Sequence, residues 1–197
     1  MNVLIGCEQS GVVRAAFEAR GHKVLSCDLE PSAKPGPHYK GDIFDVIDYP
    51  WDLGIFHPPC THTSVSGARH FRDKWADGRQ ACGVAFFLRL WRACSHIPRF
   101  CFEHPVSIMS TLHRAPDQVV QPWQFGHGEV KATCLWLHNL PPLVPTNIVE
   151  GREERIHRMP PSPERARERS KTFSGIAEAM AAQWSDDLFS QARRSAA

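Results

Sequence analysis

Short apolar runs alternate with longer patterned stretches along the first hundred positions of the chain. Four such runs predict strands: Val3–Ile5, Val24–Asp28, Leu53–Phe56 and Arg99–Phe102. Between the first two strands, apolar side chains recur at helical spacing from Val12 to Ala19, and Gly21 is suited to the helix C-cap. Strands that alternate with helices predict an α/β fold with a mostly parallel sheet.

The second half of the chain continues this alternation. Gln80–Ala93 carries apolar residues at helical spacing, which predicts a core helix. A β-type run ends at Leu137, and Ser174 is placed to cap a last helix that extends to Trp184. Residues 30–40, rich in proline, glycine and lysine, and the polar residues 61–77 predict loops. The second loop is long enough to cover a substrate.

Two predicted strands end in proline-containing loops that carry reactive side chains. Leu53–Phe56 stops at Pro58 and Pro59, which cannot continue a sheet ladder and would hold Cys60 in a stiff loop. The next strand is followed by Glu103 and a further proline. Both loops would meet at the carboxyl edge of the sheet, where open α/β sheets bind ligands. A thiol and a carboxylate there indicate nucleophilic catalysis, although each alone also fits a buried thiol or an exposed loop acid.

The first strand, helix and second strand form a β-α-β unit with features of a nucleotide site. Its first turn, Gly6 to Gly11, holds two glycines, and Asp28 ends the second strand about 20 positions later. In dinucleotide and adenosine sites, such an acid accepts hydrogen bonds from ribose hydroxyls. Asp42 could reach a nucleobase edge, cap a short helix that begins near Ile43, or do both. An ordinary crossover, in which Asp28 only caps a loop, fits the same pattern.

Composition narrows the class of protein. The chain has 197 residues, of which 42% are hydrophobic, and we expect one domain over residues 1–190 followed by a flexible tail over 191–197. Seven cysteines without a CxxC pair indicate a reducing compartment rather than a disulfide framework or a zinc ribbon. No apolar run reaches the ~18 residues of a membrane helix, and no basic-then-apolar leader opens the sequence. We therefore expect a cytoplasmic protein without membrane contact.

Charge is nearly balanced overall but basic in one segment. The formal net charge of +2 does not by itself indicate a polyanionic partner. Residues 152–171, however, hold seven Arg or Lys against four Glu. Such a segment is typical of a surface that contacts phosphates, or of a solvated helix laced with ion pairs.

In this order, the motifs resemble those of the DNA cytosine C5-methyltransferase family, and the whole pattern is similar to small phage and prophage proteins of this kind. The first turn resembles the family's cofactor loop, with Cys7 in place of its usual phenylalanine. Asp28 falls where the family binds the ribose of S-adenosylmethionine, and Asp42 where it meets the adenine. The resemblance assigns these residues to the cofactor: Gly6, Cys7, Glu8, Gln9, Ser10, Gly11, Asp28, Asp42, His57 and Pro58.

The catalytic motifs follow in the family's order. His57-Pro58-Pro59-Cys60 resembles its Pro-Cys loop, and Glu103-His104-Pro105 resembles its Glu-Asn-Val loop, with His104 in place of asparagine. Lys131-Ala132-Thr133 falls where the family has an arginine-bearing QxRxR strand, and Phe173–Gln183 is similar to its closing helix. The resemblance implies catalytic roles for Pro59, Cys60, Glu103 and Lys131.

The resemblance also implies a fold and a reaction. The fold is the Rossmann-like one of S-adenosylmethionine-dependent methyltransferases, a mostly parallel sheet with helices on both faces. The reaction is methyl transfer to carbon 5 of cytosine in DNA. Cys60 would add to carbon 6 so that carbon 5 becomes nucleophilic, and Glu103 would stabilise the activated base. A base within a duplex would have to be flipped out.

One region of the family is missing from this chain. Only about 35 residues separate Leu137 from Phe173, too few for the family's large target-recognition region of ~100 residues. The basic segment 152–171 takes its place, and the expected nucleic-acid contacts are Arg69, Arg152, Arg155 and Arg158. Single-stranded and double-stranded DNA both stay open as substrates, as does a homodimer.

Three alternatives remain. Methyl or related group transfer to a free pyrimidine nucleotide fits the missing region, because a small substrate needs only a pocket. A zinc deaminase is suggested by His57, Cys60 and His62, but position 63 is threonine where a Pro-Cys-x-x-Cys motif needs cysteine, so no metal is expected. A catalytically degenerate methyltransferase fold would bind cofactor or nucleic acid without transfer.

Overall fold

The computed structural model describes residues 1–160, 162 and 165–185, so the expected tail over 191–197 lies outside the described residues. Within them, seven strands form one sheet in the order β3-β2-β1-β4-β5-β7-β6. The strands are β1 (Asn2–Gly6), β2 (Lys23–Asp28), β3 (His38–Lys40), β4 (Leu53–Phe56), β5 (Phe100–Pro105), β6 (Gln118–Val120) and β7 (Thr133–His138).

Pairing in this sheet is mostly parallel. Strands β3, β2, β1, β4 and β5 pair in parallel, whereas β7 runs antiparallel to both β5 and β6. The order 3-2-1-4-5 is that of a doubly wound sheet: β2 and β3 are added on one side of β1, and β4 and β5 on its other side. The predicted α/β class with a mostly parallel, Rossmann-like sheet is confirmed.

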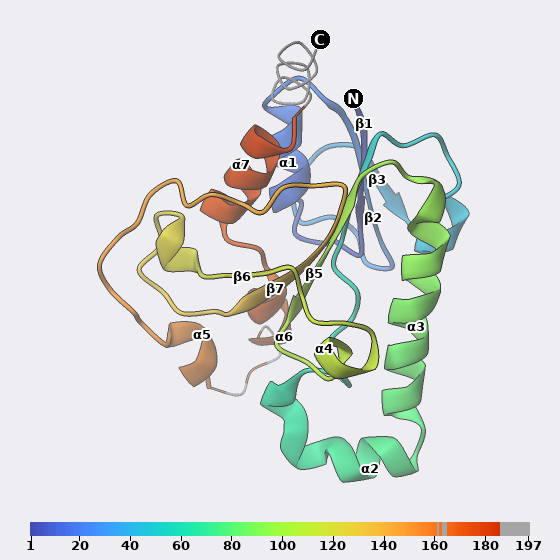
Figure 1. The fold of residues 1–197 in the computed structure, drawn as a ribbon, viewed down its shortest axis with the longest axis vertical. Coiled ribbons are helices and arrows are strands. Elements are labelled where there is room, and N and C mark those ends of the chain that lie inside the picture. Colours follow the sequence, from blue (N-terminus) through green and yellow to red (C-terminus); the bar gives the residue numbers. More distant parts are fainter. Residues whose placement is uncertain (161, 163–164, 186–197) are drawn as a thin grey trace.

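Helices cover both faces of the sheet, as expected. They are α1 (Val12–Glu18), α2 (Phe71–Ala76), α3 (Arg79–Ala93), α4 (Met109–Leu112), α5 (Arg155–Arg158), α6 (Arg165–Ser170) and α7 (Ser174–Gln183). Figure 1 shows α1 and α7 packed together on one side of the sheet and α3 on the other. Because side chains alternate along a strand, Val3 and Ile5 join the core under α1 and α7, whereas Leu4 joins the core under α3.

Gly21 was expected to form the C-cap of the first helix, but Ala19 is the C-cap of α1, and Gly21 follows two residues later with a left-handed backbone (φ +81°). The capping role predicted for Asp42 is confirmed. Asp42 caps the short 3-10 helix Ile43–Asp45, where its Oδ1 accepts a hydrogen bond of 3.1 Å from the Phe44 amide. All seven cysteines are free thiols. In the described part of the chain, no helix has the length and apolar character to cross a bilayer.

Both predicted loops were partly wrong. Residues 30–40 end in strand β3, a short edge strand that pairs with β2. Residues 61–77 contain a 3-10 helix, Val65–His70, and α2. Most residues of these short elements are exposed or only half-buried, so the sequence shows no apolar periodicity there. Strand β6 was not predicted at all.

Two element ends were also misplaced. Glu103-His104-Pro105 was expected to follow its strand but forms the last three residues of β5. The end of β5 extends beyond β4, so that only β7 pairs with its last residues. A proline is tolerated there because one side of the strand has no partner strand that needs its N–H. Ser174 does not cap α7. Phe173 occupies the N-cap position, and the Ser174 hydroxyl lies 3.3 Å from His127 Nε2 instead.

Candidate active site

The carboxyl edge of the sheet brings two loops together around β4 and β5. Pairing between these strands ends at Phe56 and Phe102, so the last residues of β5 extend beyond β4. The chain leaving β4 stays close to them, because the Thr63 hydroxyl in its loop lies 3.3 Å from His104 Nε2. The His57 amide donates a hydrogen bond of 2.9 Å to the Gly6 carbonyl, and the loop then turns through Cys60. Sheet geometry therefore sets Cys60 beside the end of β5.

Glu103 is held as a carboxylate at this edge. Its side chain is only 8% exposed, and Oε2 accepts hydrogen bonds from His57 Nδ1 at 3.1 Å and from the Thr172 hydroxyl at 2.9 Å. Burial acts to raise the pKa of this carboxyl, but the charges of His57 and Lys131 and the two hydrogen bonds together lower it to about 2. Among the described residues, Oε1 has no hydrogen-bond partner and can accept one from a ligand.

His57 forms an ion pair with Glu103. Burial disfavours the charged imidazole, but the charge of Glu103 and the hydrogen bond to it, together with the charge of Glu8, raise the pKa of His57 above its ordinary value. Lys131 opposes this shift. The imidazolium uses Nδ1 for Glu103, whereas its buried Nε2 has no partner among the described residues. The resemblance assigned His57 to the cofactor alone, and it did not predict this pair.

Cys60 lies under the electrostatic influence of Lys131. Burial raises the pKa of the Cys60 thiol, and the positive charge of Lys131 partly offsets this rise. Burial in turn lowers the pKa of Lys131, against the charges of Glu103 and Cys60. Lys131 Nζ donates a hydrogen bond of 2.8 Å to the Lys171 carbonyl, which fixes the ammonium. The cysteine is therefore a thiol at rest, with a cation available to stabilise its thiolate.

His104, which replaces asparagine in the family motif, connects the two loops. Its Nε2 lies 3.3 Å from the Thr63 hydroxyl in the Cys60 loop, and its Nδ1 lies 3.1 Å from the Ser107 hydroxyl. The ring stands edge-on to Phe87. Burial lowers the pKa of His104 to about 4, so it is neutral at physiological pH. Its contacts are those of a positioning residue.

The residues assigned to the cofactor lie at or after the carboxyl ends of β1, β2, β3 and β4. Cys7 and Gly11, in the turn after β1, have left-handed backbones with φ of 57° and 68°. Burial raises the pKa of Cys7, and the negative charges of Asp28 and Asp42 add to it, so both carboxylates lie close to this turn. Gln9, in the same turn, donates a hydrogen bond of 3.1 Å to the Pro31 carbonyl.

Orphaned polar atoms at this edge fit a polar cofactor. Glu8 Oε1 accepts hydrogen bonds from the Ser10 hydroxyl at 2.8 Å and from the Val13 amide at 2.9 Å, whereas its buried Oε2 has no partner among the described residues. His57 Nε2 is the second such atom. One carboxylate oxygen and one imidazolium N–H complement the charged groups of S-adenosylmethionine, so the residues fit this cofactor. In the adjoining loop Pro58 is buried, whereas Pro59 is exposed.

The four predicted nucleic-acid contacts are exposed arginines, but two of them are paired. Arg155 pairs with Glu129 and Arg158 with Glu154, each at 2.8 Å. Arg152 stacks over the ring of Trp123 at 3.9 Å, and Arg69 bonds to the neighbouring histidine. Within the described residues, Arg69 and Arg152 have no carboxylate partner.

Sequence reasoning missed Thr172, Thr63 and Ser107, whose contacts hold Glu103 and His104. Hydroxyl residues of this kind carry no motif, and only their position in space reveals them. In the described residues, no group of three or more His, Cys, Asp or Glu is arranged to hold a metal ion.

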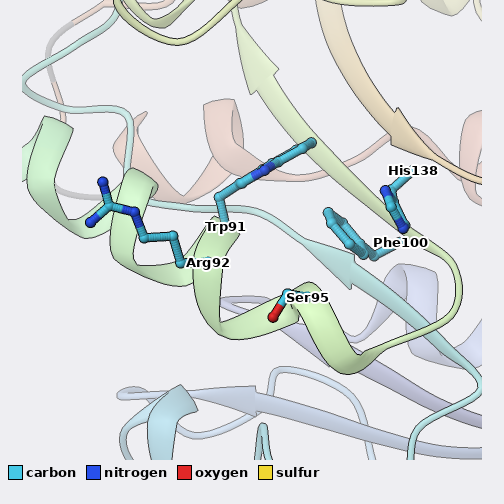
Figure 2. A pocket seen from close by; sticks show the side chains of 5 residues that line it. All are labelled: Trp91, Arg92, Ser95, Phe100 and His138. Atoms are coloured by element: carbon cyan, nitrogen blue, oxygen red, sulfur yellow. The ribbon is translucent and has the colours of Figure 1, made fainter.

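A separate hollow lies away from this site. It has a volume of about 390 Å³ and is lined by Trp91, Arg92, Ser95, Phe100 and His138 (Figure 2). The Phe100 and His138 rings stack with centroids 4.5 Å apart. Because Phe100 begins β5 and Glu103 lies toward its end, the hollow is at the opposite edge of the sheet. None of the predicted site residues lines it.

Comparisons with known proteins do not assign this chain to a family. No protein-family model matches the chain, and no curated protein does. Among solved structures, it is similar to an Escherichia coli protein that is described provisionally as a DNA modification methyltransferase encoded within a prophage. The TM-score is 0.47, with 14% identity over 70% of this chain, and the chain spans 46% of that neighbour's length. This likeness is too distant to carry an argument.

Proposed function

We propose that the protein is an S-adenosylmethionine-dependent methyltransferase that acts at carbon 5 of cytosine in DNA. The observation that carries this proposal is the arrangement at the carboxyl edge, where Cys60, Glu103 and Lys131 influence one another's charge beside the turn after β1. The combination of a nucleophile, an anion that can bind a base edge and a nearby nucleotide-type turn is what this reaction requires.

Cys60 supplies the nucleophile. Its thiolate adds to carbon 6 of the cytosine ring, and the electrons of the 5,6 double bond shift so that carbon 5 becomes enamine-like. Lys131 favours the thiolate because its ammonium charge opposes the effect of burial. The exposed Pro59 and the buried Pro58 restrict the backbone that carries the thiol.

Glu103 binds the base that Cys60 attacks. Its free Oε1 accepts a hydrogen bond from the exocyclic amine of cytosine. The His57 imidazolium behind it can pass a proton through the carboxylate to N3 as negative charge develops there. Preorganised groups of this kind typically supply several kcal/mol of transition-state stabilisation.

The cofactor, when bound, supplies an electrophilic methyl group for carbon 5. The turn from Gly6 to Gly11 would bind it together with Asp28 and Asp42, the candidate ribose and adenine contacts. Solvent then removes the carbon 5 proton, elimination of the Cys60 sulfur restores the 5,6 double bond and the free thiolate, and the N3 proton returns through Glu103 to His57.

Label transfer from methyl-labelled S-adenosylmethionine tests this proposal. We would offer duplex DNA, single-stranded DNA, RNA and free cytosine nucleotides separately and analyse the nucleosides by mass. We expect labelled 5-methylcytosine in DNA, lost in Cys60→Ala but retained in Cys82→Ala, which removes an exposed thiol on α3. Cys60→Ala should still bind cofactor. Turnover by that variant, or absence of label from every substrate, would contradict the proposal.

A second candidate is the same transfer to a free pyrimidine nucleotide. It is favoured by the ion pairs of Arg155 and Arg158, which reduce the free charge available for a DNA backbone. Label on mononucleotides but not on any polymer would establish this alternative.

A further inference from the structure

Two buried polar atoms without a partner in the described residues belong to side chains that follow adjacent strands at the carboxyl edge. They are Glu8 Oε2 and His57 Nε2. Gly6 and Phe56 pair in the sheet as the last residues of the neighbouring strands β1 and β4. Glu8 and His57 therefore follow two adjacent strand ends. Glu8 is only 4% exposed, and its charge acts on His57, which places the two groups near each other. Buried polar groups of this kind destabilise the folded protein unless a ligand or a water molecule forms a hydrogen bond with them.

Each side chain is fixed through its other polar atom. Glu8 Oε1 is held by the Ser10 hydroxyl and the Val13 amide, and His57 Nδ1 is held by Glu103 at 3.1 Å. The free atoms therefore have defined positions, with one anionic acceptor and one cationic donor. An ammonium and a carboxylate attached to the same carbon, as in an α-amino acid, complement this pair.

The strand order decides which end of the cofactor would reach this pair. Along the edge β3-β2-β1-β4, Asp42 follows β3, Asp28 ends β2, Glu8 follows β1 and His57 follows β4. A nucleoside held by Asp28 and Asp42 leaves its amino-acid end over β1 and β4.

We propose that Glu8 binds the ammonium and His57 binds the carboxylate at the methionine end of S-adenosylmethionine. This inference rests on the proposed function. His57 would then contact the cofactor through Nε2 and Glu103 through Nδ1. The charged groups that act on it are Glu8 from the turn after β1, Glu103 from β5 and Lys131 from the segment before β7. Cofactor binding would thereby stabilise the imidazolium that faces the catalytic carboxylate.

Calorimetric titration with truncated ligands tests this assignment. S-adenosylhomocysteine carries both charged groups, whereas 5′-methylthioadenosine keeps the nucleoside and the sulfur but lacks the amino-acid group. The wild-type protein should bind S-adenosylhomocysteine about a hundredfold more tightly, as two charge-assisted contacts would give. Glu8→Gln and His57→Gln should each reduce that preference about tenfold, with the affinity for 5′-methylthioadenosine unchanged. Asp28→Asn should weaken both ligands alike, because its candidate partner, the ribose, is common to them.

Two further ligands, compared between the wild-type protein and the two variants, assign each contact to its residue. Decarboxylated S-adenosylhomocysteine lacks the group assigned to His57, and the deaminated analogue lacks the group assigned to Glu8. His57→Gln should be insensitive to loss of the carboxylate, and Glu8→Gln to loss of the ammonium. A wild-type protein that binds all four ligands equally well would overturn this inference but leave the methyltransferase proposal standing. Failure of the wild-type protein to bind any of them would overturn both.

Discussion

At the scale of single residues, burial and close neighbours shift the pKa values of the ionisable groups in the site away from their ordinary values in water. Despite burial, the charge of His57 and the hydrogen bonds from His57 and Thr172 lower the pKa of Glu103, and Glu103 in turn raises the pKa of His57. Cys60 is protonated at rest because burial raises its pKa. Activation of the thiol therefore depends on the cation that acts on it, Lys131.

Removal of that cation should shift the titration of Cys60. In Lys131→Met, the pKa of the thiol should rise further, because the charge that opposes the effect of burial is lost. Because the thiolate is the reactive form, this rise should slow alkylation of Cys60 by iodoacetamide several-fold at neutral pH. Mass spectrometry of the Cys60 peptide measures this rate separately from the other thiols. Lys40→Met, on the exposed strand β3, is the control, and equal rates in both variants would contradict the role of Lys131.

His104 should make stability depend on pH in mildly acidic solution. Burial lowers its folded-state pKa from 6.5 to about 4, so between these values the unfolded chain binds a proton that the folded protein does not. Its contribution to the free energy of unfolding is present above pH 6.5 and is lost as the pH falls toward 4. The loss is about 1.4 kcal/mol per pH unit at most.

Urea unfolding of His104→Gln between pH 7 and pH 4.5 tests this linkage. The variant is expected to be less stable than the wild type at pH 7, but its stability should fall less steeply with acid. His157→Gln, which changes an exposed histidine on α5, should keep the wild-type slope. If the slope of His104→Gln matched that of the wild type, the buried imidazole would not be the acid-sensitive group.

At the scale of elements, the segment before α7 joins the last helix to the active site. Thr172 donates to Glu103, and the Lys171 carbonyl accepts from Lys131 Nζ. Helix α7 itself packs against α1 and the core formed with β1. A displacement of α7 would therefore move two contacts of the site at once.

Gly175 is the position at which α7 is most sensitive to substitution. A Cβ there would overlap the carbonyl oxygen of Phe125, and the Gly175 amide donates to His127 Nε2 at 3.1 Å. Gly175→Ala should lower the free energy of unfolding by about 1–3 kcal/mol, the range for overpacked sites. Glu178→Ala, on the exposed face of the same helix, should change it by less than about 0.5 kcal/mol. Similar denaturation midpoints for the two variants would show that α7 is not seated against Phe125.

At the scale of the whole molecule, the proposed affinity for DNA would depend on arginines that have no carboxylate partner and can contact phosphates. Arg152 has no carboxylate partner among the described residues, whereas Arg158 pairs with Glu154. Fluorescence anisotropy with a labelled oligonucleotide at several salt concentrations should show weaker binding by Arg152→Ala, with the salt slope reduced by about one. Arg158→Ala should have a smaller effect, because phosphate binding there must first break an ion pair. Equal effects of the two substitutions would contradict this difference.

The sequence by itself determined the framework. Runs such as Leu53–Phe56 predicted strands, because a buried parallel strand must be apolar along its length, and Gln80–Ala93 predicted a helix from its spacing. The positions of Cys60 and Glu103 at one edge followed from the rule that parallel strands end together. Short elements such as β3 and β6 escaped prediction, because three residues at a sheet margin carry too little pattern.

Only the tertiary structure decided how these groups are charged and held. The pair of His57 with Glu103 joins the loop after β4 to strand β5, and Thr172 reaches the same carboxylate from a distant part of the chain. His104 became a connection between loops because burial keeps it neutral between Thr63 and Ser107. Ionisation depends on burial and on neighbours within a few ångströms, and folding sets those distances between residues that the sequence keeps far apart.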